Sequence, residues 1–204
     1  MMRKKLLLAS LLGVGLTVPA LAQTEQGSKL IGVNVGNLSY RSSNQNNSLS
    51  AALYPSAGIF VTNNLLLGSS VSLSYYRQHF TNYFQDYRSR TFSYGLAPFA
   101  RYYVPGSGRH RFFGQISAGV QRSSIWVENK SDIGPGKQHD IYREVTYGGA
   151  LGYNYFITPV AALEVTAGYG RNTNGPNPTT GTLDVRAGFS LFLPSRKAAA
   201  VPTN

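Results

Sequence analysis

The sequence predicts an all-β fold, an eight-stranded antiparallel up-and-down transmembrane β-barrel, and three observations carry that prediction. Apolar and polar residues alternate with a period of two over eight segments, which is the pattern of strands with one apolar and one polar face. The connections between the segments alternate between short turns and longer polar stretches. Aromatic residues gather near the segment ends, as in the girdles of membrane barrels.

The clearest segment is the last one, residues 182–193. All of its odd positions from Leu183 to Leu193 are apolar, whereas the even positions begin with Asp184, Arg186, Gly188 and Ser190, and only Phe192 breaks the rule. A tilted strand needs about 9–11 residues to cross a bilayer. We therefore expect this segment to be the closing transmembrane strand.

The other seven segments follow the same rule with less regularity. They are residues 30–40, 49–61, 65–75, 92–104, 112–127, 145–157 and 161–169. Pro55 and Pro98 fall on the apolar face of two of them. Because proline cannot donate to a strand ladder, we expect each to mark a bulge.

The connections predict the orientation of the barrel. Residues 62–64, 105–111 and 158–160 are short and turn-like, whereas residues 41–48, 78–91, 128–142 and 170–181 are longer and polar. Outer-membrane barrels have short periplasmic turns and longer external loops. Both termini are therefore expected in the periplasm.

The chain divides into three parts. Residues 1–22 combine Arg3, Lys4 and Lys5 with an apolar run and a final Ala-Leu-Ala, which predicts a cleaved signal peptide. Residues 23–193 form the predicted barrel, and residues 194–204 lack periodicity and are expected to be a flexible tail. The absence of cysteine excludes disulfides and thiolate metal sites.

A soluble lipocalin-like barrel or a β-sandwich would also show alternation, but with the polar face outside. The polar face here is rich in Gly, Ser and Ala, which suits a narrow lumen. The aromatic residues also form two groups, one at each expected rim. The outer group contains Tyr75, Phe80, Tyr83, Phe84, Tyr87, Trp126 and Tyr142, and the periplasmic group contains Phe60, Tyr102, Tyr103, Phe112, Phe113 and Tyr155.

Residues 29–193 resemble the small eight-stranded outer-membrane barrels of the OmpA/OmpX type. The resemblance implies a cell outer membrane location. The closing segment from Arg186 to Leu193 is similar to the C-terminal signal read by the barrel-assembly machinery, with Gly188, Leu191 and Leu193 at the key positions. It departs from that signal by having leucine instead of an aromatic residue at the last two of these positions. The barrel-assembly machinery is thus an expected partner.

The sequence offers little for catalysis, and no cofactor or metal site is expected. The three histidines are His79, His110 and His139. The segment from His79 to Thr81 is faintly similar to the His-x-Ser segment of lipid A deacylases, with threonine in place of the serine nucleophile. A surface histidine is the favoured interpretation, and the protein is not expected to be an enzyme.

Basic residues gather at the expected outer rim, chiefly Arg77, Arg88, Arg90, Arg122, Arg143 and Arg171. Ordinary solvated loops with local ion pairs would explain them. The functional interpretation is contact with the phosphates of outer-leaflet lipopolysaccharide, because arginine provides paired donors for phosphate. Location excludes nucleic acid as a partner.

The lumen of an eight-stranded barrel is just wide enough for its own side chains to fill. Glu164 and Arg186 share the inward face of adjacent strands, and a hairpin centred on Gly175 would place them opposite each other as an ion pair. We therefore expect a monomeric, non-enzymatic envelope protein with a filled lumen, acting as a structural or interaction protein. A small passive pore and a lipid A-modifying enzyme are the alternatives.

Overall fold

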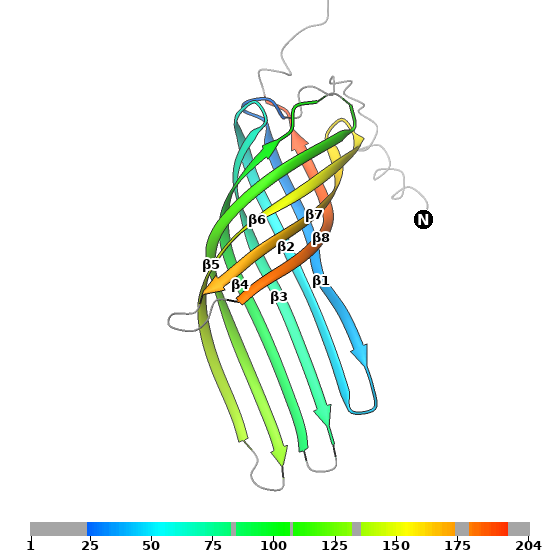
Figure 1. Ribbon diagram of the computed structural model, residues 1–204, viewed down its shortest axis with the longest axis vertical. Helices are drawn as coiled ribbons and strands as arrows, with labels where there is room; N and C mark the ends of the chain where they lie inside the picture. Colours follow the sequence, from blue (N-terminus) through cyan, green and yellow to red (C-terminus); the bar gives the residue numbers. More distant parts are fainter. Residues whose placement is uncertain (1–23, 83–84, 107, 132–135, 174–179, 196–204) are drawn as a thin grey trace, which may run out of the picture.

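The computed structural model describes residues 24–82, 85–106, 108–131, 136–173 and 180–195, and these form a closed barrel of eight strands (Figure 1). Each strand pairs antiparallel with its neighbours in sequence, and the last pairs with the first. The predicted fold class is confirmed. The strands are β1 (Lys29–Ser42), β2 (Asn46–Thr62), β3 (Leu65–Thr81), β4 (Gln85–Tyr103), β5 (His110–Ser131), β6 (Gly136–Thr158), β7 (Ala161–Thr173) and β8 (Thr180–Leu193). The described part of the chain contains no helix long and apolar enough to cross a bilayer.

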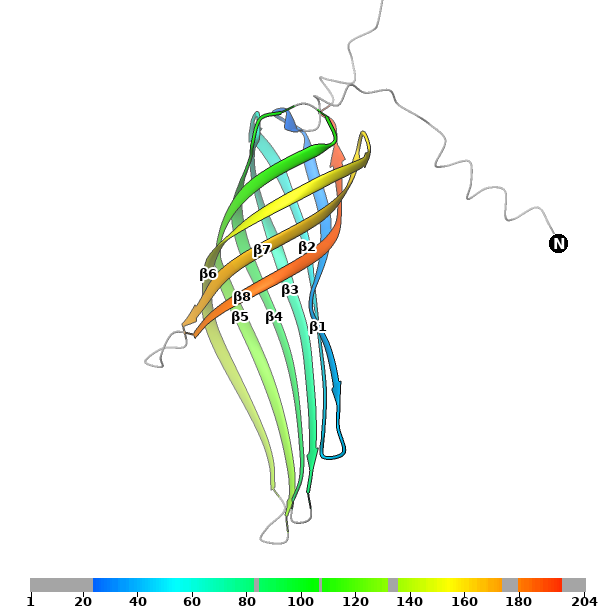
Figure 2. The same cartoon turned by 45° about the vertical axis from the view of Figure 1, so that its right-hand side comes forward.

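The strands are strongly inclined to the barrel axis (Figures 1 and 2). A row of paired residues that starts at Leu193 runs through Lys29 and then around the ring, and returns to β8 ten residues earlier, at Leu183. This stagger over eight strands corresponds to a tilt of about 40°. As a consequence, each row climbs toward the outer end of the barrel on its way from β1 to β8.

The two ends of the barrel differ. At the end with the short turns the ring is complete, whereas at the opposite end β1 to β6 continue well beyond the level at which β7 and β8 stop (Figures 1 and 2). β6 pairs with β7 only from Val145 onward, and β1 pairs with β8 only from Lys29 to Gly36. The outer part is therefore an extended sheet instead of a closed ring.

This extension corrects the prediction of long external loops. Most of residues 78–91 and 128–142 belong to β3, β4, β5 and β6, and the connections shrink to 43–45, 82–84, 132–135 and 174–179. Both faces of a strand can be polar once it has left the membrane, so the alternation that identified the spans disappears there.

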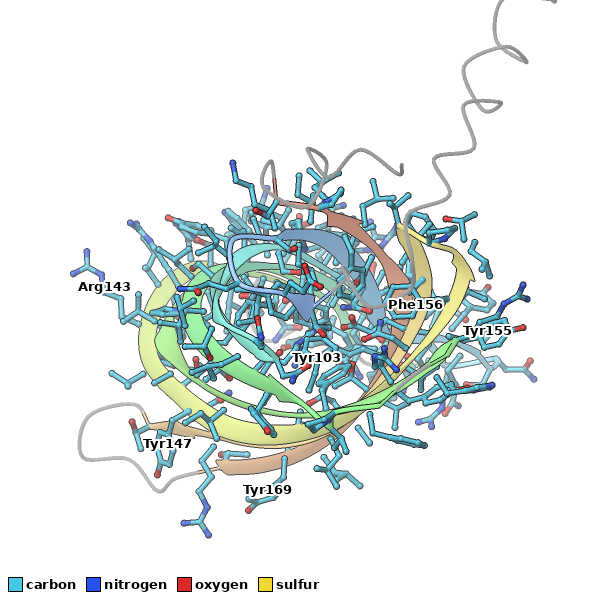
Figure 3. All side chains as sticks on the ribbon, turned by 90° about the horizontal axis from the view of Figure 1, so that it is seen from above. Tyr103, Arg143, Tyr147, Tyr155, Phe156 and Tyr169 are labelled. Carbon is cyan, nitrogen blue, oxygen red and sulfur yellow. The ribbon has the colours of Figure 1, made fainter. Side chains whose placement is uncertain are left out.

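The predicted faces are confirmed within the membrane-spanning part. Val165 is 48% exposed whereas its neighbour Thr166 is 8% exposed, and the same contrast recurs on every strand. Figure 3 shows Tyr147, Tyr155 and Tyr169 pointing away from the ring, while Tyr103 lies inside it. The apolar side chains thus face lipid, and the soluble alternative is wrong because its polar face would have to be outside.

The prolines do not mark bulges, contrary to expectation. The β2–β3 pairing is interrupted at Pro55 and the β4–β5 pairing at Pro98, but the register is the same on both sides of each gap. The register instead shifts between Gly36 and Ser39 in β1, where Asn37 has a φ of 51°, and next to the β2–β3 and β6–β7 turns. A missing donor on one side of a strand removes a hydrogen bond without inserting a residue.

The segment before β1 caps the short-turn end. Thr24 bonds through its side chain and its carbonyl to Asn64, and Gly27 donates its amide hydrogen to the Phe60 carbonyl at 2.8 Å. The predicted signal peptide (1–22) lies outside the described residues, as does the tail after Ser195. Those two predictions stay untested.

Candidate functional site: a buried lumen network and an outer basic face

An apolar cluster fills the lumen at the periplasmic end. Phe192, the single exception to the alternation of β8, is 1% exposed and packs against Phe156 at a ring-centroid distance of 4.8 Å. The prediction of a periplasmic girdle is wrong for Phe60, Tyr103 and Phe113, which belong to this cluster, whereas Tyr102 and Phe112 do face outward. The cluster as a whole contains Leu30, Phe60, Leu66, Phe99, Tyr103, Phe113, Phe156, Ala162 and Phe192.

A buried ion pair lies directly against this cluster. Glu164 on β7 is 1% exposed and Arg101 on β4 is 4% exposed. The Arg101 guanidinium donates from Nη1 to Oε2 of Glu164 at 2.9 Å and from Nη2 to Oε1 at 3.1 Å. Arg101 also donates to the hydroxyl of Tyr103 and lies 3.9 Å from the centroid of the Phe113 ring. This is a two-point pair held against aromatic faces, the geometry in which arginine is bound most strongly.

Polar side chains from three other strands complete the carboxylate's partners. Asn34 of β1 donates to Oε1 at 3.0 Å, Asn154 of β6 to Oε2 at 3.1 Å, and Ser190 of β8 to Oε2 at 2.9 Å. Because each buried charge has its opposite charge and its hydrogen bonds, the pair can remain ionised inside the barrel. The network joins strands from opposite sides of the ring.

The predicted partner of Glu164 was therefore wrong. The β7–β8 register places Glu164 opposite Gly188 and Thr166 opposite Arg186, two residues away from the predicted alignment. Arg186 instead bonds to Asp184, and its guanidinium carbon lies 3.8 Å from the centroid of the Tyr54 ring. A slip of two residues keeps every side chain on its face, so the alternation that placed both residues inside could not fix their pairing.

The residues of the predicted assembly signal occupy the seam between β8 and β1. Gly188 lies opposite both Glu164 and Asn34, and a Cβ atom there would collide with the Val33 carbonyl oxygen and the Asn34 side chain. Glycine at this position thus allows the Asn34–Glu164 hydrogen bond. Leu191 and Leu193 lie on the lipid-facing side of β8. Recognition by the assembly machinery stays a prediction.

The outer half of the lumen is a polar cavity of about 310 Å³. Serines of β3 and polar residues of β5 line much of it, including Ser70, Ser72, Ser74, Gln115, Ser117 and Gln121. It lies on the outer side of the Arg101–Glu164 pair. The lumen is therefore filled at one end and hollow at the other.

The outward face of the outer rim carries two pairs of arginines that lie directly opposite each other on neighbouring strands. Arg77 of β3 pairs with Arg90 of β4, and Arg122 of β5 pairs with Arg143 of β6. Within the described residues, none of these four forms a salt bridge, and the Nε of Arg122 is buried with no hydrogen-bond partner. Like charges directly opposite each other destabilise a sheet unless something neutralises them.

Three of these arginines lie at one height on the barrel. The row of Arg77 passes through Arg90 and Trp126 and reaches β6 at His139, four residues beyond Arg143. Three of the eight strand steps raise a row by about 4 residues of the total stagger, which brings Arg77 level with Arg143. Arg122 lies next to Arg143, and Figure 3 shows Arg143 reaching away from the wall. We call Arg77, Arg122 and Arg143 the arginine belt.

The other predicted outer arginines have different surroundings. Arg88 forms an ion pair with Asp86 at 3.2 Å, as the interpretation of solvated loops expected. Arg171 on β7 lies opposite Tyr147, and its Nε is 3.4 Å from the Tyr169 hydroxyl. The six predicted residues therefore share the outward face but do not form a single cluster.

The cluster around His79 does not have the geometry of a nucleophilic triad. Thr81 Oγ1 lies 2.9 Å and Asp86 Oδ1 lies 2.6 Å from the same ring nitrogen, Nε2. In a triad the nucleophile and the acid contact opposite nitrogens of the ring. The hydrogen bond from His79 holds the pKa of Asp86, beyond the membrane-spanning part of β4, below its ordinary value. Among the described residues no group of His, Asp and Glu side chains could hold a metal ion.

A closed ring of tilted antiparallel strands with an apolar exterior and buried charges inside defines a transmembrane β-barrel. Residues 7–190 match the family model of the outer membrane protein beta-barrel domain, and the chain belongs to that family of cell outer membrane proteins.

Solved barrels of the same kind are similar to the chain. Ail, the attachment invasion locus protein of Yersinia pestis, is 14% identical with a TM-score of 0.44, covering 81% of this chain and 99% of Ail. Neisserial surface protein A is 17% identical with a TM-score of 0.44 and the same coverage. OprG from Pseudomonas aeruginosa is 11% identical with a TM-score of 0.45, covering 86% of this chain and all of OprG. No curated protein matches the chain.

Proposed function

We propose that this protein is a non-enzymatic envelope barrel that binds the phosphates of lipopolysaccharide through its arginine belt and conducts no solute through its lumen. The observation that carries the proposal is the direct opposition of Arg122 and Arg143 on the lipid-facing surface. On the same outward face, two residues nearer the periplasm along each strand, lie Val120 and Val145, both well exposed to lipid. The two cations therefore mark the outer boundary of the apolar band.

A phosphate placed between two such guanidinium groups would neutralise their mutual repulsion and accept hydrogen bonds from both. Lipid A presents phosphates at this boundary of the outer leaflet. The position of Arg77 at the same height supports a belt that could contact more than one phosphate. Because these are largely exposed charge contacts, binding should weaken as the salt concentration rises.

Two features support a closed lumen. The apolar cluster fills the periplasmic end, and the Arg101–Glu164 pair with its amide and hydroxyl partners lies above it. Opening a path would require breaking a buried ion pair, which leaves two uncompensated charges. The shared ring nitrogen of His79 supports the absence of triad chemistry at the rim.

The proposal is tested with purified protein in detergent micelles and lipid A as the probe. The double variant Arg122→Gln/Arg143→Gln should bind lipid A at least about tenfold more weakly, since loss of a charged hydrogen bond costs about 1.5–3 kcal/mol. The matched control is Lys29→Gln/Arg109→Gln, which removes two exposed basic residues at the periplasmic rim. Equal affinity of the two variants would overturn the proposed binding. A steady conductance of the wild-type protein in planar bilayers would overturn the closed lumen.

A further inference from the structure

A pocket of about 250 Å³ lies on the outward face of the extended sheet, where β4, β5 and β6 run side by side. Arg88 and Arg90 contribute from β4, Trp126 and Glu128 from β5, and Lys137 and His139 from β6; Val127 and Gln138 complete the lining. The predicted phosphate contacts include Arg88 and Arg90, but Trp126 and His139 were not connected with them in the sequence.

The aromatic wall of this pocket consists of two stacked rings. Trp126 and His139 lie directly opposite each other on β5 and β6. Their rings stack with centroids 4.9 Å apart and an angle of 6° between their planes. Trp126 is nevertheless 45% exposed. A large aromatic surface that stacks on a neighbouring ring and is still exposed provides a platform for the C–H face of a sugar ring.

The charged side chains of the pocket are more basic than acidic, and not all of the basic ones are paired. Asp86 pairs with Arg88, and Glu128 lies 3.5 Å from Lys137, but no salt bridge of the described residues involves Arg90. Arg77 lies directly opposite Arg90 on β3. In addition, the Nε of Arg88 is buried and has no hydrogen-bond partner. The pocket therefore combines an aromatic platform with unpaired donors for an anionic group.

The height of the pocket identifies which part of a lipopolysaccharide it would meet. Trp126 and His139 each lie four residues further out along their strands than Arg122 and Arg143. At about 3.3 Å per residue and a tilt of about 40°, this places the two rings about 10 Å further out than Arg122 and Arg143. The sugars of the lipopolysaccharide core lie in that layer, outside the phosphates of lipid A.

We infer that the Trp126 pocket binds a phosphorylated sugar of the lipopolysaccharide core of the protein's own membrane. The sugar ring packs on Trp126, and its phosphate takes the free donors of Arg88 and Arg90. This inference rests on the proposed function, since lipid A on the arginine belt brings the core sugars to this level. The Trp126 pocket would thus be a second binding site, which recognises the saccharide, whereas the arginine belt recognises the lipid.

Trp126 is the only tryptophan of the chain, so its fluorescence reports on the pocket in the whole protein without a label. The protein in detergent micelles is titrated with phosphorylated core oligosaccharide freed of its lipid, and with the same oligosaccharide after removal of its phosphates. We expect a saturable change with the first and at least tenfold weaker binding of the second. Arg88→Gln/Arg90→Gln should also weaken binding at least tenfold, whereas the Lys29→Gln/Arg109→Gln control should not.

Calorimetry of Trp126→Leu, for which heat replaces fluorescence, separates the platform from the charges. Loss of oligosaccharide binding with unchanged lipid A binding is the expected result. If lipid A still binds through Arg122 and Arg143 but the oligosaccharide leaves Trp126 unaffected, the inference fails and the proposed function stands. If lipid A does not bind, the proposed function is wrong, and the inference that rests on it is wrong as well. Tighter binding of a soluble polysaccharide unrelated to the core would overturn the assigned source.

Discussion

The two halves of this barrel are built on different principles. In the periplasmic half the ring is closed, the lumen is packed with aromatic side chains, and a buried ion pair ties β4 to β7. In the outer half β1 to β6 continue as an extended sheet (Figure 2). The space inside this half is a polar cavity whose wall contains the Asp184–Arg186 ion pair, and the arginine belt lies on its outward face. The comparison indicates that the buried contacts gather in the periplasmic half, whereas the outer half is the one to which the proposed binding sites belong.

The largest expected effect tests the periplasmic half through its ion pair. Glu164→Gln should lower the free energy of unfolding from lipid vesicles by about 3–5 kcal/mol, because it leaves Arg101 buried without its counter-charge. The double variant Glu164→Gln/Arg101→Met should lose less than the sum of the single variants. Lys29→Gln/Arg109→Gln, which removes two exposed charges at the periplasmic rim, is the control. Additive effects would show that the pair has no coupling.

Matched aromatic truncations compare the two halves directly. Phe192→Ala opens a void in the apolar cluster and should cost about 3–5 kcal/mol of unfolding free energy. Trp126→Ala removes a larger side chain from the outer sheet but should cost less than about 1 kcal/mol, because its site is half exposed. Urea titrations in vesicles measure both. A larger loss for Trp126→Ala would reverse the assignment of the two halves.

Neighbouring substitutions on β7 sharpen the contrast between lipid and lumen. Val165→Arg places a cation in the apolar band and should cost about 2–4 kcal/mol. Thr166→Arg points into the lumen, where Thr166 lies between Glu164 and the polar cavity, so its cost should depend on the Glu164 network and the space in the lumen and not on lipid. The cost of Val165→Arg should therefore depend on the lipid of the vesicles, whereas the cost of Thr166→Arg should not. Wild-type stability of Val165→Arg would refute the assigned faces.

The smallest expected effect lies at the tip of the extended sheet. His79→Ala should raise the pKa of Asp86 back toward its ordinary value of about 3.9, because the main cause of its lowering is the hydrogen bond from His79. A lowered pKa means that the ionised carboxylate favours the folded tip above the ordinary pKa. This contribution disappears as the pH falls through the lowered pKa. Carboxyl NMR titrations of both proteins measure the shift, and identical curves would contradict the hydrogen bond.

The faces of the strands could be predicted because the alternation of apolar and polar residues is visible within each strand. Lipid and lumen impose opposite demands on successive residues, so Val165 and Thr166 reveal their directions without any knowledge of the partner strand. The outer extensions of β4 and β5 could not be recognised in this way. Both of their faces meet water, and their sequences therefore resemble those of loops.

Pairing across the lumen could not be predicted, because it depends on the closure and stagger of the whole ring. Arg101 and Glu164 are three strands apart, and no local pattern connects them. One signal was available, namely that Arg101 carries a charge on the inward face. The inward parity of Phe60, Tyr103 and Phe113 near the periplasmic ends also indicated a packed core, but their position beside the turns favoured a girdle.

The short join between β1 and β8 has a mechanical consequence. A ring under outward tension fails at its weakest seam, and this seam runs only from Lys29 to Gly36, while the bulge at Asn37 turns the rest of β1 away. Glu164 reaches across it, holding Asn34 of β1 and Ser190 of β8 at once. The buried carboxylate therefore links the two strands of the shortest ladder to each other and to Arg101 on β4, so that a force opening this seam must also break the ion pair.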